Sequence, residues 1–415
     1  MNPLNTKTKP IDSYFMDFCK MYPKAYNKKK TGPYSKTRVI LLNGLEFESN
    51  WFMHQFARNC DNDELRREIA LIRKQEQQQQ KRISCLKPIN ENILETTIAY
   101  EQLAIDLTAT LAQNDTDKNN IKALNFALLE DFDHLYRFSN LLMIDKGEDA
   151  ANLVGKFTEI MPARPTIAHH RYPKDDVKKP MNAKKSALYS KLVAGIITAA
   201  EQQTMNFYMN IAQWYKNDLG RKLYAEIGMV EEEHVSQYES LKDPTCSWLE
   251  QLVMHEYTEC YLYYSCYSEE DNTSLKQIWL EHYEMECAHL KKAIELLEKY
   301  ENKSYETVFG DGEFPTLLKL GTNKEYIRKV IAETVNLTGN KADYIDINKL
   351  SDKADFFKYQ QAIISDETLV PSHMVIERTI SELGQDYRYQ DKPNPIKDLN
   401  NRKKDNVCVG RVKSK

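Results

Sequence analysis

The sequence of 415 residues has few cysteines, and none of them lies in a Cys-x-x-Cys pair. Its eight cysteines are scattered singly, with neither the spacing of a zinc site nor the density of a secreted disulfide scaffold. No Gly-Lys-Ser or Gly-Lys-Thr follows Gly310 and Gly312, so this glycine pair indicates a turn and not a phosphate loop. These absences argue against a zinc finger, a disulfide-rich fold and a P-loop nucleotide site.

Long apolar runs and a strong net charge are missing as well. No segment approaches the length that spans a bilayer, and the first residues lack the apolar core of a signal peptide. A formal net charge of −4 gives no attraction of the whole protein to nucleic acid. We therefore expect a cytoplasmic protein that binds neither membranes nor nucleic acid.

What the sequence does contain is a pair of Glu-x-x-His motifs. Glu231 and His234 lie one helical turn apart and can aim a carboxylate and an imidazole at one point, and Glu286 and His289 repeat this spacing. A further glutamate precedes each motif by 30 residues. This is the ligand list of a di-metal carboxylate four-helix bundle. The sequence thus predicts one site for two metal ions, made by Glu201, Glu231, His234, Glu256, Glu286 and His289.

The same pattern recurs at an offset of 155 residues. It gives a second, degenerate set: Glu46, Glu76, Gln79, Glu101, Asp131 and His134. Residues with no link to metal binding obey the offset too, for example Phe52 and Phe207, which argues for an internal repeat. Gln79 replaces an imidazole by an amide and Asp131 has a shorter side chain, so we expect this set to bind metal more weakly or only at the His134 side. Alternatively, His54 supplies the missing imidazole.

These motifs resemble the ferritin-like superfamily and, within it, the rubrerythrin group. That group carries an extra carboxylate one turn after the third-helix glutamate, and here Glu259 follows Glu256 by three residues. The resemblance implies two iron ions, or manganese, and gives Glu259 a catalytic role as a carboxylate that moves on and off the metal. Because the group's four-cysteine iron domain is missing, it also implies that a separate protein donates any electrons.

The repeat predicts an all-α fold with two tandem ferritin-like four-helix bundles. The expected divisions are a basic N-terminal arm at 1–39, bundles at 40–146 and 186–300 with a linker at 147–185 between them, and a helical extension at 301–415 that ends in a basic tail. Only 25 residues separate Glu231 from Glu256, so the long crossover of the ferritin-like topology would be taut. A simple hairpin is the alternative, in an up-down-up-down bundle or with hairpins from different halves pairing.

Some further residues are open to two interpretations. Counting helical turns from the ligands places Tyr208, Tyr224, Tyr238 and Trp279 on inward faces, where such residues usually form core. Near a metal centre, Tyr238 would instead donate a hydrogen bond or an electron. His169 and His170 in the linker suggest extra ligands or a lid, although surface histidines are the commoner case.

Three functions are compatible with the predicted metal site. Carboxylate and imidazole ligands suit iron or manganese, and the first hypothesis is an oxidoreductase that reacts with peroxide or O₂. The second is a non-enzymatic protein that binds or stores iron, and the third is an oxygenase acting on a small molecule. The first hypothesis requires a separate protein that donates electrons. A homodimer is also possible, with the C-terminal extension as the dimer contact.

Overall fold

The chain is mostly helical, as the sequence predicts. The computed structural model describes residues 1–161, 163–164 and 166–385. Within this part, the chain forms thirteen α-helices and one two-stranded antiparallel sheet. The basic tail expected from Arg402 lies outside the described residues. None of the described helices combines the length and the apolar character that a membrane crossing requires.

Eight long helices make up the main body, and they fall into two sets of four whose starts lie 155 residues apart. The first set is α1 (Pro33–Arg58), α2 (Asp63–Ser84), α3 (Ile93–Asn114) and α4 (Lys118–Lys146). The second set is α6 (Leu188–Ala212), α7 (Asp218–Glu239), α8 (Trp248–Glu269) and α9 (Thr273–Glu301). The internal repeat is therefore visible in the helix boundaries.

The repeated boundaries have a local cause in the capping residues. Asn92 and Ser247, which are 155 residues apart, each form a capping box with the glutamate three residues on. Gly147 and Asn302, at the same offset, end α4 and α9 in the left-handed conformation that glycine and asparagine tolerate best. Short-range chemistry thus fixes where the helices begin and end in both halves.

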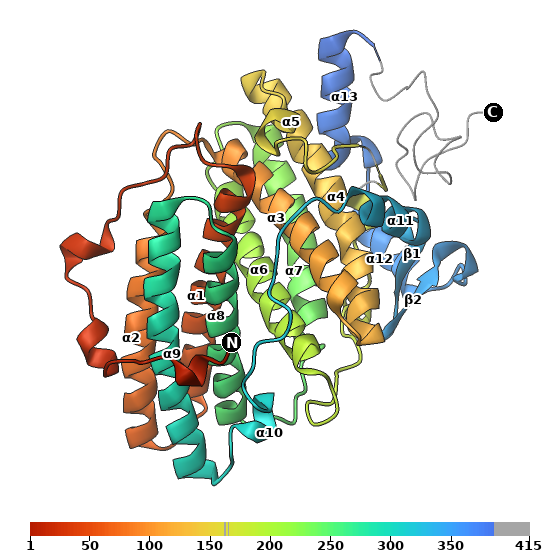
Figure 1. The fold of residues 1–415 in the computed structure, drawn as a ribbon. Helices are drawn as coiled ribbons and strands as arrows, with labels where there is room; N and C mark the ends of the chain where they lie inside the picture. Colours follow the sequence, from red (N-terminus) through yellow and green to blue (C-terminus); the bar gives the residue numbers. More distant parts are fainter. Residues whose placement is uncertain (162, 165, 386–415) are drawn as a thin grey trace.

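The helices pair across the two halves of the chain (Figure 1). The hairpin of α1 and α2 packs against that of α8 and α9, and we call this group bundle A. The hairpin of α3 and α4 packs against that of α6 and α7, which gives bundle B. Helix α1 also contacts α3 and α6, so the two bundles share one continuous body.

The expected tandem bundles at 40–146 and 186–300 are therefore wrong. Each bundle takes one hairpin from each half, which is one of the alternatives that the short connection left open. The connections from α2 to α3 and from α7 to α8 span only residues 85–92 and 240–247. Because each connection steps to the neighbouring bundle, it does not have to climb back along a helix.

The N-terminal arm is docked rather than free. It forms three short 3-10 turns, η1 (Pro3–Asn5), η2 (Ile11–Tyr14) and η3 (Phe18–Met21), that contact α2 and α9. The terminal amino group lies 2.6 Å from the carboxylate of Glu313. Helix α1 then begins at Pro33, so the expected arm at 1–39 is several residues too long.

The C-terminal region adds short elements to the outside of the body. They are α10 (Glu306–Phe309), α11 (Lys324–Thr334), α12 (Asp355–Ile363), α13 (Pro371–Leu383) and a hairpin of β1 (Leu337–Asn340) with β2 (Asp343–Asp346). Helix α11 packs on α4, and α13 packs on α4 and α7. The sequence predicts a helical extension here, and it does not predict the β-hairpin.

The linker between the halves covers bundle B. It contains α5 (Ala150–Leu153) and the turns η4 (Thr166–Ala168) and η5 (Pro173–Asp175). Its His169 and His170 are buried, so the interpretation as surface histidines is wrong. A segment that looks like an irregular connection thus forms part of the core.

Candidate metal centres

Each bundle encloses one cluster of buried acids and histidines. Their candidate ligand atoms form four groups, and in every group these atoms lie within 4.8 Å of one another. In bundle A the groups are Glu76, Glu256, Glu286 and His289, and Glu46, Glu76 and Glu259. In bundle B they are Asp131, Glu201, Glu231 and His234, and Glu101, His134 and Glu231. We call the two clusters centre A and centre B.

One glutamate is common to both groups of each centre. Glu76 joins the two groups of centre A, and Glu231 joins those of centre B. The two residues are related by the offset of 155, so they occupy equivalent positions on α2 and α7. Each centre therefore has the layout of two adjacent cation sites with a shared carboxylate between them.

The histidines present their Nδ1 atoms to the carboxylates. Nδ1 of His289 lies 2.6 Å from Oε1 of Glu76 and 3.1 Å from Oε2 of Glu286. In centre B, Nδ1 of His234 and of His134 lie 2.9 Å and 3.0 Å from the two oxygens of Glu231. These contacts place one ring nitrogen of each histidine inside its cluster.

The outer nitrogens of two of these rings are held by partners from facing helices. Nε2 of His289 lies 2.8 Å from Oε1 of Gln75, and Nε2 of His234 lies 2.7 Å from Oε2 of Glu130. A metal-bound histidine commonly donates its other N–H to such an acceptor, which fixes the tautomer and the orientation of the ring. Gln75 and Glu130 precede Glu76 and Asp131, so neighbouring residues on one helix supply a ligand and an orienting group.

The electrostatics of centre B reflect crowded acids. Burial and the charges of nearby acids raise the pKa of Glu101 and of Asp131 well above their ordinary values, and burial raises that of Glu201 to about 7. Burial also opposes the ionisation of Glu231, but the charges of His134 and His234 hold its pKa at about 2. The cluster is short of positive charge.

Centre A has the same shortage. Burial, followed by the charges of neighbouring acids, raises the pKa of Glu46, Glu256 and Glu259 well above the ordinary value. Although burial favours the neutral imidazole, Glu76 and Glu286 raise the pKa of His289. One cationic imidazole does not balance five carboxyl groups.

The buried oxygen atoms supply the test of fit for metal ions. In the described part of the chain, both carboxylate oxygens of four residues are buried without a hydrogen bond: Asp131, Glu201, Glu256 and Glu259. An unsatisfied buried polar group costs about 1–3 kcal/mol, and more if it is charged. Divalent cations compensate such groups, and the mixture of carboxylate and imidazole suits iron or manganese. The residues therefore fit a pair of ions in each centre.

The predicted six-residue site of the second half is divided between the two centres. Glu201, Glu231 and His234 lie in centre B, whereas Glu256, Glu286 and His289 lie in centre A. The degenerate set is divided in the same way, with Glu46, Glu76 and Gln79 at centre A and Glu101, Asp131 and His134 at centre B. Periodicity found the inward positions, but the pairing of the hairpins decided which of them meet.

This division changes the expected quality of the sites. Both centres offer six candidate ligands, but centre B has four carboxylates and two imidazoles, so Asp131 and His134 belong to the set with more imidazole. Centre A has five carboxylates and one imidazole, and Gln79 donates hydrogen bonds to Glu46 and Glu286. His54 does not replace the missing imidazole, because its side chain is exposed on the other face of α1.

Glu259 and Tyr238, expected at a single catalytic site, belong to different centres. Glu259 joins the group of Glu46 and Glu76 in centre A. Tyr238 lies beside centre B, with its ring 6.2 Å from that of His234 and its hydroxyl buried without a partner among the described residues. The inward positions expected for Tyr208, Tyr224 and Trp279 are confirmed, because all three are fully buried.

Family models, curated proteins and solved structures give no match to this chain. The case for the two centres therefore rests on the geometry and chemistry described above.

Several residues near the centres do not belong to the predicted ligand sets. The hydroxyl of Tyr263 donates to Glu46 and lies 3.0 Å from Nδ1 of His282. Tyr263 follows Glu256 by seven residues, and His282 precedes Glu286 by four, so counting turns from these ligands finds both. No such count finds Glu130 or Arg171, since their roles depend on the linker.

The linker packs buried charged side chains against centre B. Arg171 donates two hydrogen bonds of 2.9 and 3.0 Å to Glu130, the residue that orients His234. Nδ1 of His170 lies 3.1 Å from Glu233 on α7. The ring of His169 lies 5.8 Å from that of His134, and burial lowers its pKa well below the ordinary value. A neutral imidazole thus stands next to this centre.

Proposed function

We propose that this chain is a di-metal carboxylate protein with two centres, one in each of two interleaved four-helix bundles. Each centre would hold two iron ions, or manganese ions, and Glu76 or Glu231 would be the ligand common to both. The observation that carries the proposal is the shared glutamate at equivalent positions, surrounded by buried carboxylates whose oxygens lack hydrogen bonds. In this proposal the protein resembles the ferritin-like superfamily and the rubrerythrin group in its chemistry.

The side chains have distinct roles in this arrangement. Glu76 and Glu231 would each serve both cation sites of a centre, and His134, His234 and His289 would offer their Nδ1 atoms as ligands. Gln75 and Glu130 keep two of these rings in the binding orientation through their outer nitrogens. The hydroxyls of Tyr263 and Tyr208 donate to Oε1 of Glu46 and of Glu101, and so orient each carboxylate.

We further propose that the protein is an oxidoreductase that reacts with peroxide or O₂ and receives electrons from a separate protein. Such a pair of ions, when bound, supplies two electrons to an oxidant and recovers them from the donor. Glu259 adds a fifth carboxylate at centre A, where it can change its contacts as the charge of the centre changes. Tyr238 places a buried hydroxyl beside centre B, where it can donate a hydrogen bond.

The experiment that tests this function begins with metal analysis of the full chain purified without oxygen. We expect iron or manganese in proportion to two centres, and an ultraviolet-visible spectrum that changes on oxidation. Steady consumption of peroxide with an added reductant supports the oxidoreductase. Uptake of iron far beyond the capacity of the centres supports storage instead. Protein that binds neither metal after reconstitution contradicts the proposal.

A further inference from the structure

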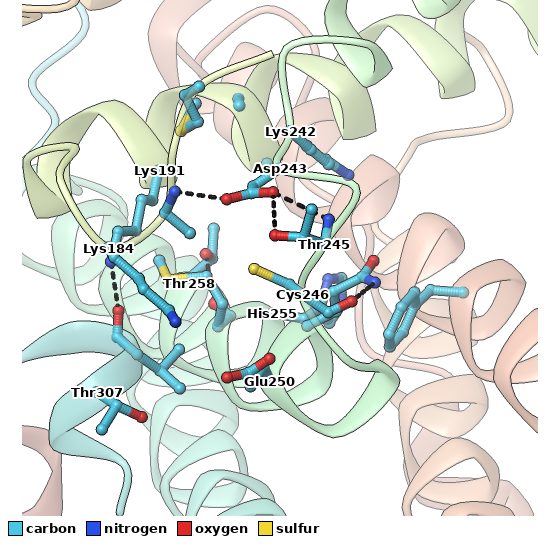
Figure 2. A pocket seen from close by; sticks show the side chains of 18 of the residues that line it. Lys184, Lys191, Lys242, Asp243, Thr245, Cys246, Glu250, His255, Thr258 and Thr307 are labelled. Carbon is cyan, nitrogen blue, oxygen red and sulfur yellow. Dashed lines mark hydrogen bonds between the residues drawn. The ribbon is translucent and has the colours of Figure 1, made fainter.

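A cavity of about 760 Å³ lies beside bundle A (Figure 2). Its walls come from α1, α6 and α8 and from the chain near residues 181–184, 242–246 and 303–308. This volume is in the range of pockets that enclose a small organic molecule. The cavity therefore has room for a ligand larger than peroxide or O₂.

One side chain reaches from this cavity to centre A. His255 on α8 lines the cavity, and its Nε2 lies 3.5 Å from Oε1 of Glu259. Its Nδ1 lies 3.1 Å from Oε2 of Glu48, which also lines the cavity. The ring stacks on Phe52 with centroids 5.6 Å apart. His255 is thus held between the cavity and a candidate ligand of the metal centre.

The equivalent positions beside centre B hold different residues. At the offset of 155, Tyr100 corresponds to His255 and Phe207 to Phe52, and the two rings stack with centroids 4.5 Å apart. Ala104 takes the position of Glu259. The contact between an imidazole and a carboxylate that His255 and Glu259 make beside centre A therefore has no counterpart in Tyr100 and Ala104. The two centres therefore differ in what can approach them.

The lining of the cavity indicates the kind of molecule it accepts. Its apolar side chains suit a hydrocarbon body: Leu45, Phe52, Met181, Met254 and Val308. Its acids already have donors, since Asp243 accepts from Ala183 and Thr245, and Glu250 accepts from Ser247.

Two of its lysines are less engaged. The ammonium of Lys184 has no hydrogen bond or ion pair to any residue that the structure describes, and the ammonium of Lys242 is 3.9 Å from Glu48. The polar groups of the cavity that remain available to a ligand are therefore these two ammonium groups, and they suit an anionic group on the ligand.

We propose that the cavity binds a small organic acid with a hydrocarbon body, and that this molecule is the substrate brought to centre A. The carboxylate of the ligand lies near Lys184 and Lys242, and its apolar end approaches the wall formed by Phe52 and His255. The assignment of the molecule as a substrate rests on the proposed metal centre, whereas the binding site itself does not. Centre A, and not centre B, is then the centre that meets an organic molecule.

The test uses the full-length protein and decanoate as the probe, with decanol as the uncharged analogue. Calorimetric titration should detect decanoate binding, and decanol should bind at least fivefold more weakly. Replacing Lys184 and Lys242 together by methionine should remove this preference. Lys185→Met is the matched control, because Lys185 is exposed and does not line the cavity. Equal binding of the two probes, or no binding of either, overturns the proposal.

A second variant fills the cavity. A Cβ atom at Gly195 would meet only Thr258, at 3.7 and 3.8 Å, so Gly195→Phe should fold while its ring occupies the cavity. We expect at least a tenfold loss of decanoate affinity with unchanged metal content. An unchanged affinity in a folded variant overturns the cavity assignment.

Metal measurements separate this proposal from the function on which it rests. In iron-loaded protein, decanoate should change the spectrum of the wild type but not that of Gly195→Phe. If decanoate binds but the protein holds no metal, the proposed function fails and the binding site stands. If metal is bound and decanoate leaves the spectrum unchanged, the assignment of the ligand as substrate of centre A is overturned.

Discussion

Glu231 contributes to both groups of centre B, so a change at this residue affects every ion that the centre holds. Its counterpart Glu76 does the same in centre A. The shared carboxylate would neutralise positive charge in both cation sites of its centre. The other glutamates of the centre each belong to one group, so they cannot replace it. This makes the two residues the most direct test of two separate centres.

Glu231→Ala should halve the metal bound by the full chain, with centre A left intact. Metal analysis after identical reconstitution of wild type and variant measures this. Glu232→Gln is the matched control, because Glu232 is adjacent but exposed. Loss of all metal in Glu231→Ala would contradict independent centres, and no loss would remove Glu231 from the ligands.

Gln79 is the residue at which centre A departs most from centre B. Gln79→His should strengthen metal binding at centre A by about tenfold, because an imidazole is a better donor to iron than an amide oxygen. The measurement is a metal titration in the Glu231→Ala background, where centre A is isolated. Gln77→His on the exposed face of α2 is the control. An equal gain in both variants would mean that the added histidine binds metal nonspecifically.

Asp106 gives a prediction that does not involve metal. Burial raises its pKa from the ordinary 3.8 to about 7, although Thr158 and Tyr34 donate hydrogen bonds to it. The folded protein thus keeps a proton that the unfolded chain releases between pH 4 and 7, and its stability falls as the pH rises through this window.

Asp106→Asn should raise the free energy of unfolding at pH 8 by up to about 4 kcal/mol and leave it nearly unchanged at pH 4. Urea unfolding at both pH values measures the difference. The exposed Asp61→Asn is the control. A variant that loses stability equally at both pH values would show that the hydrogen bonds of Asp106 outweigh the cost of its charge.

At the scale of elements, the linker does more than connect the halves. Arg171 is fully buried, and its guanidinium contacts Glu130 and lies 2.7 Å from Asp176. Removing one member of a buried charge network leaves the others uncompensated. The linker therefore contributes to the stability of bundle B and, through Glu130, to the position of His234.

Arg171→Met should destabilise the protein by about 3 kcal/mol and weaken metal binding at centre B. Chemical unfolding and metal analysis of the same preparation test both effects. Arg221→Met is the control, since Arg221 forms an exposed pair with Asp218, and solvent and salt screen such a surface pair. An Arg171→Met protein as stable as the control would mean that the linker packs on bundle B without supporting it.

At the scale of the whole molecule, the pairing of hairpins makes the two halves dependent on each other. Each half supplies only two of the four helices of each bundle, and each centre takes candidate ligands from both halves. An isolated half would expose the apolar faces of both its hairpins. Neither half is then a folding unit.

Fragments 1–156 and 157–415, expressed separately, should neither bind metal nor unfold cooperatively. Produced together, they should purify as one complex with metal in both centres. Circular dichroism during heating and metal analysis measure the two properties. A fragment 157–415 that folds alone and holds a full centre would instead support the tandem arrangement.

The sequence by itself determines the helices and their inward faces. Capping residues such as Asn92 and Ser247 act within one turn, and the spacing of Glu231 and His234 follows from the geometry of a single helix. The offset of 155 residues is equally local, because it compares one helix with another of the same kind. All of the predicted ligand positions are buried in the structure.

Only the tertiary structure decides which inward faces meet. Glu231 and Glu286 belong to the same half, yet they lie in different centres because α7 packs against α4 whereas α9 packs against α2. Both arrangements bury the same apolar stripes, so periodicity cannot distinguish them. The choice depends on the short connections and on long-range packing between α1 and α6. The burial of the linker histidines has the same origin, since it arises from contacts with helices far away in the chain.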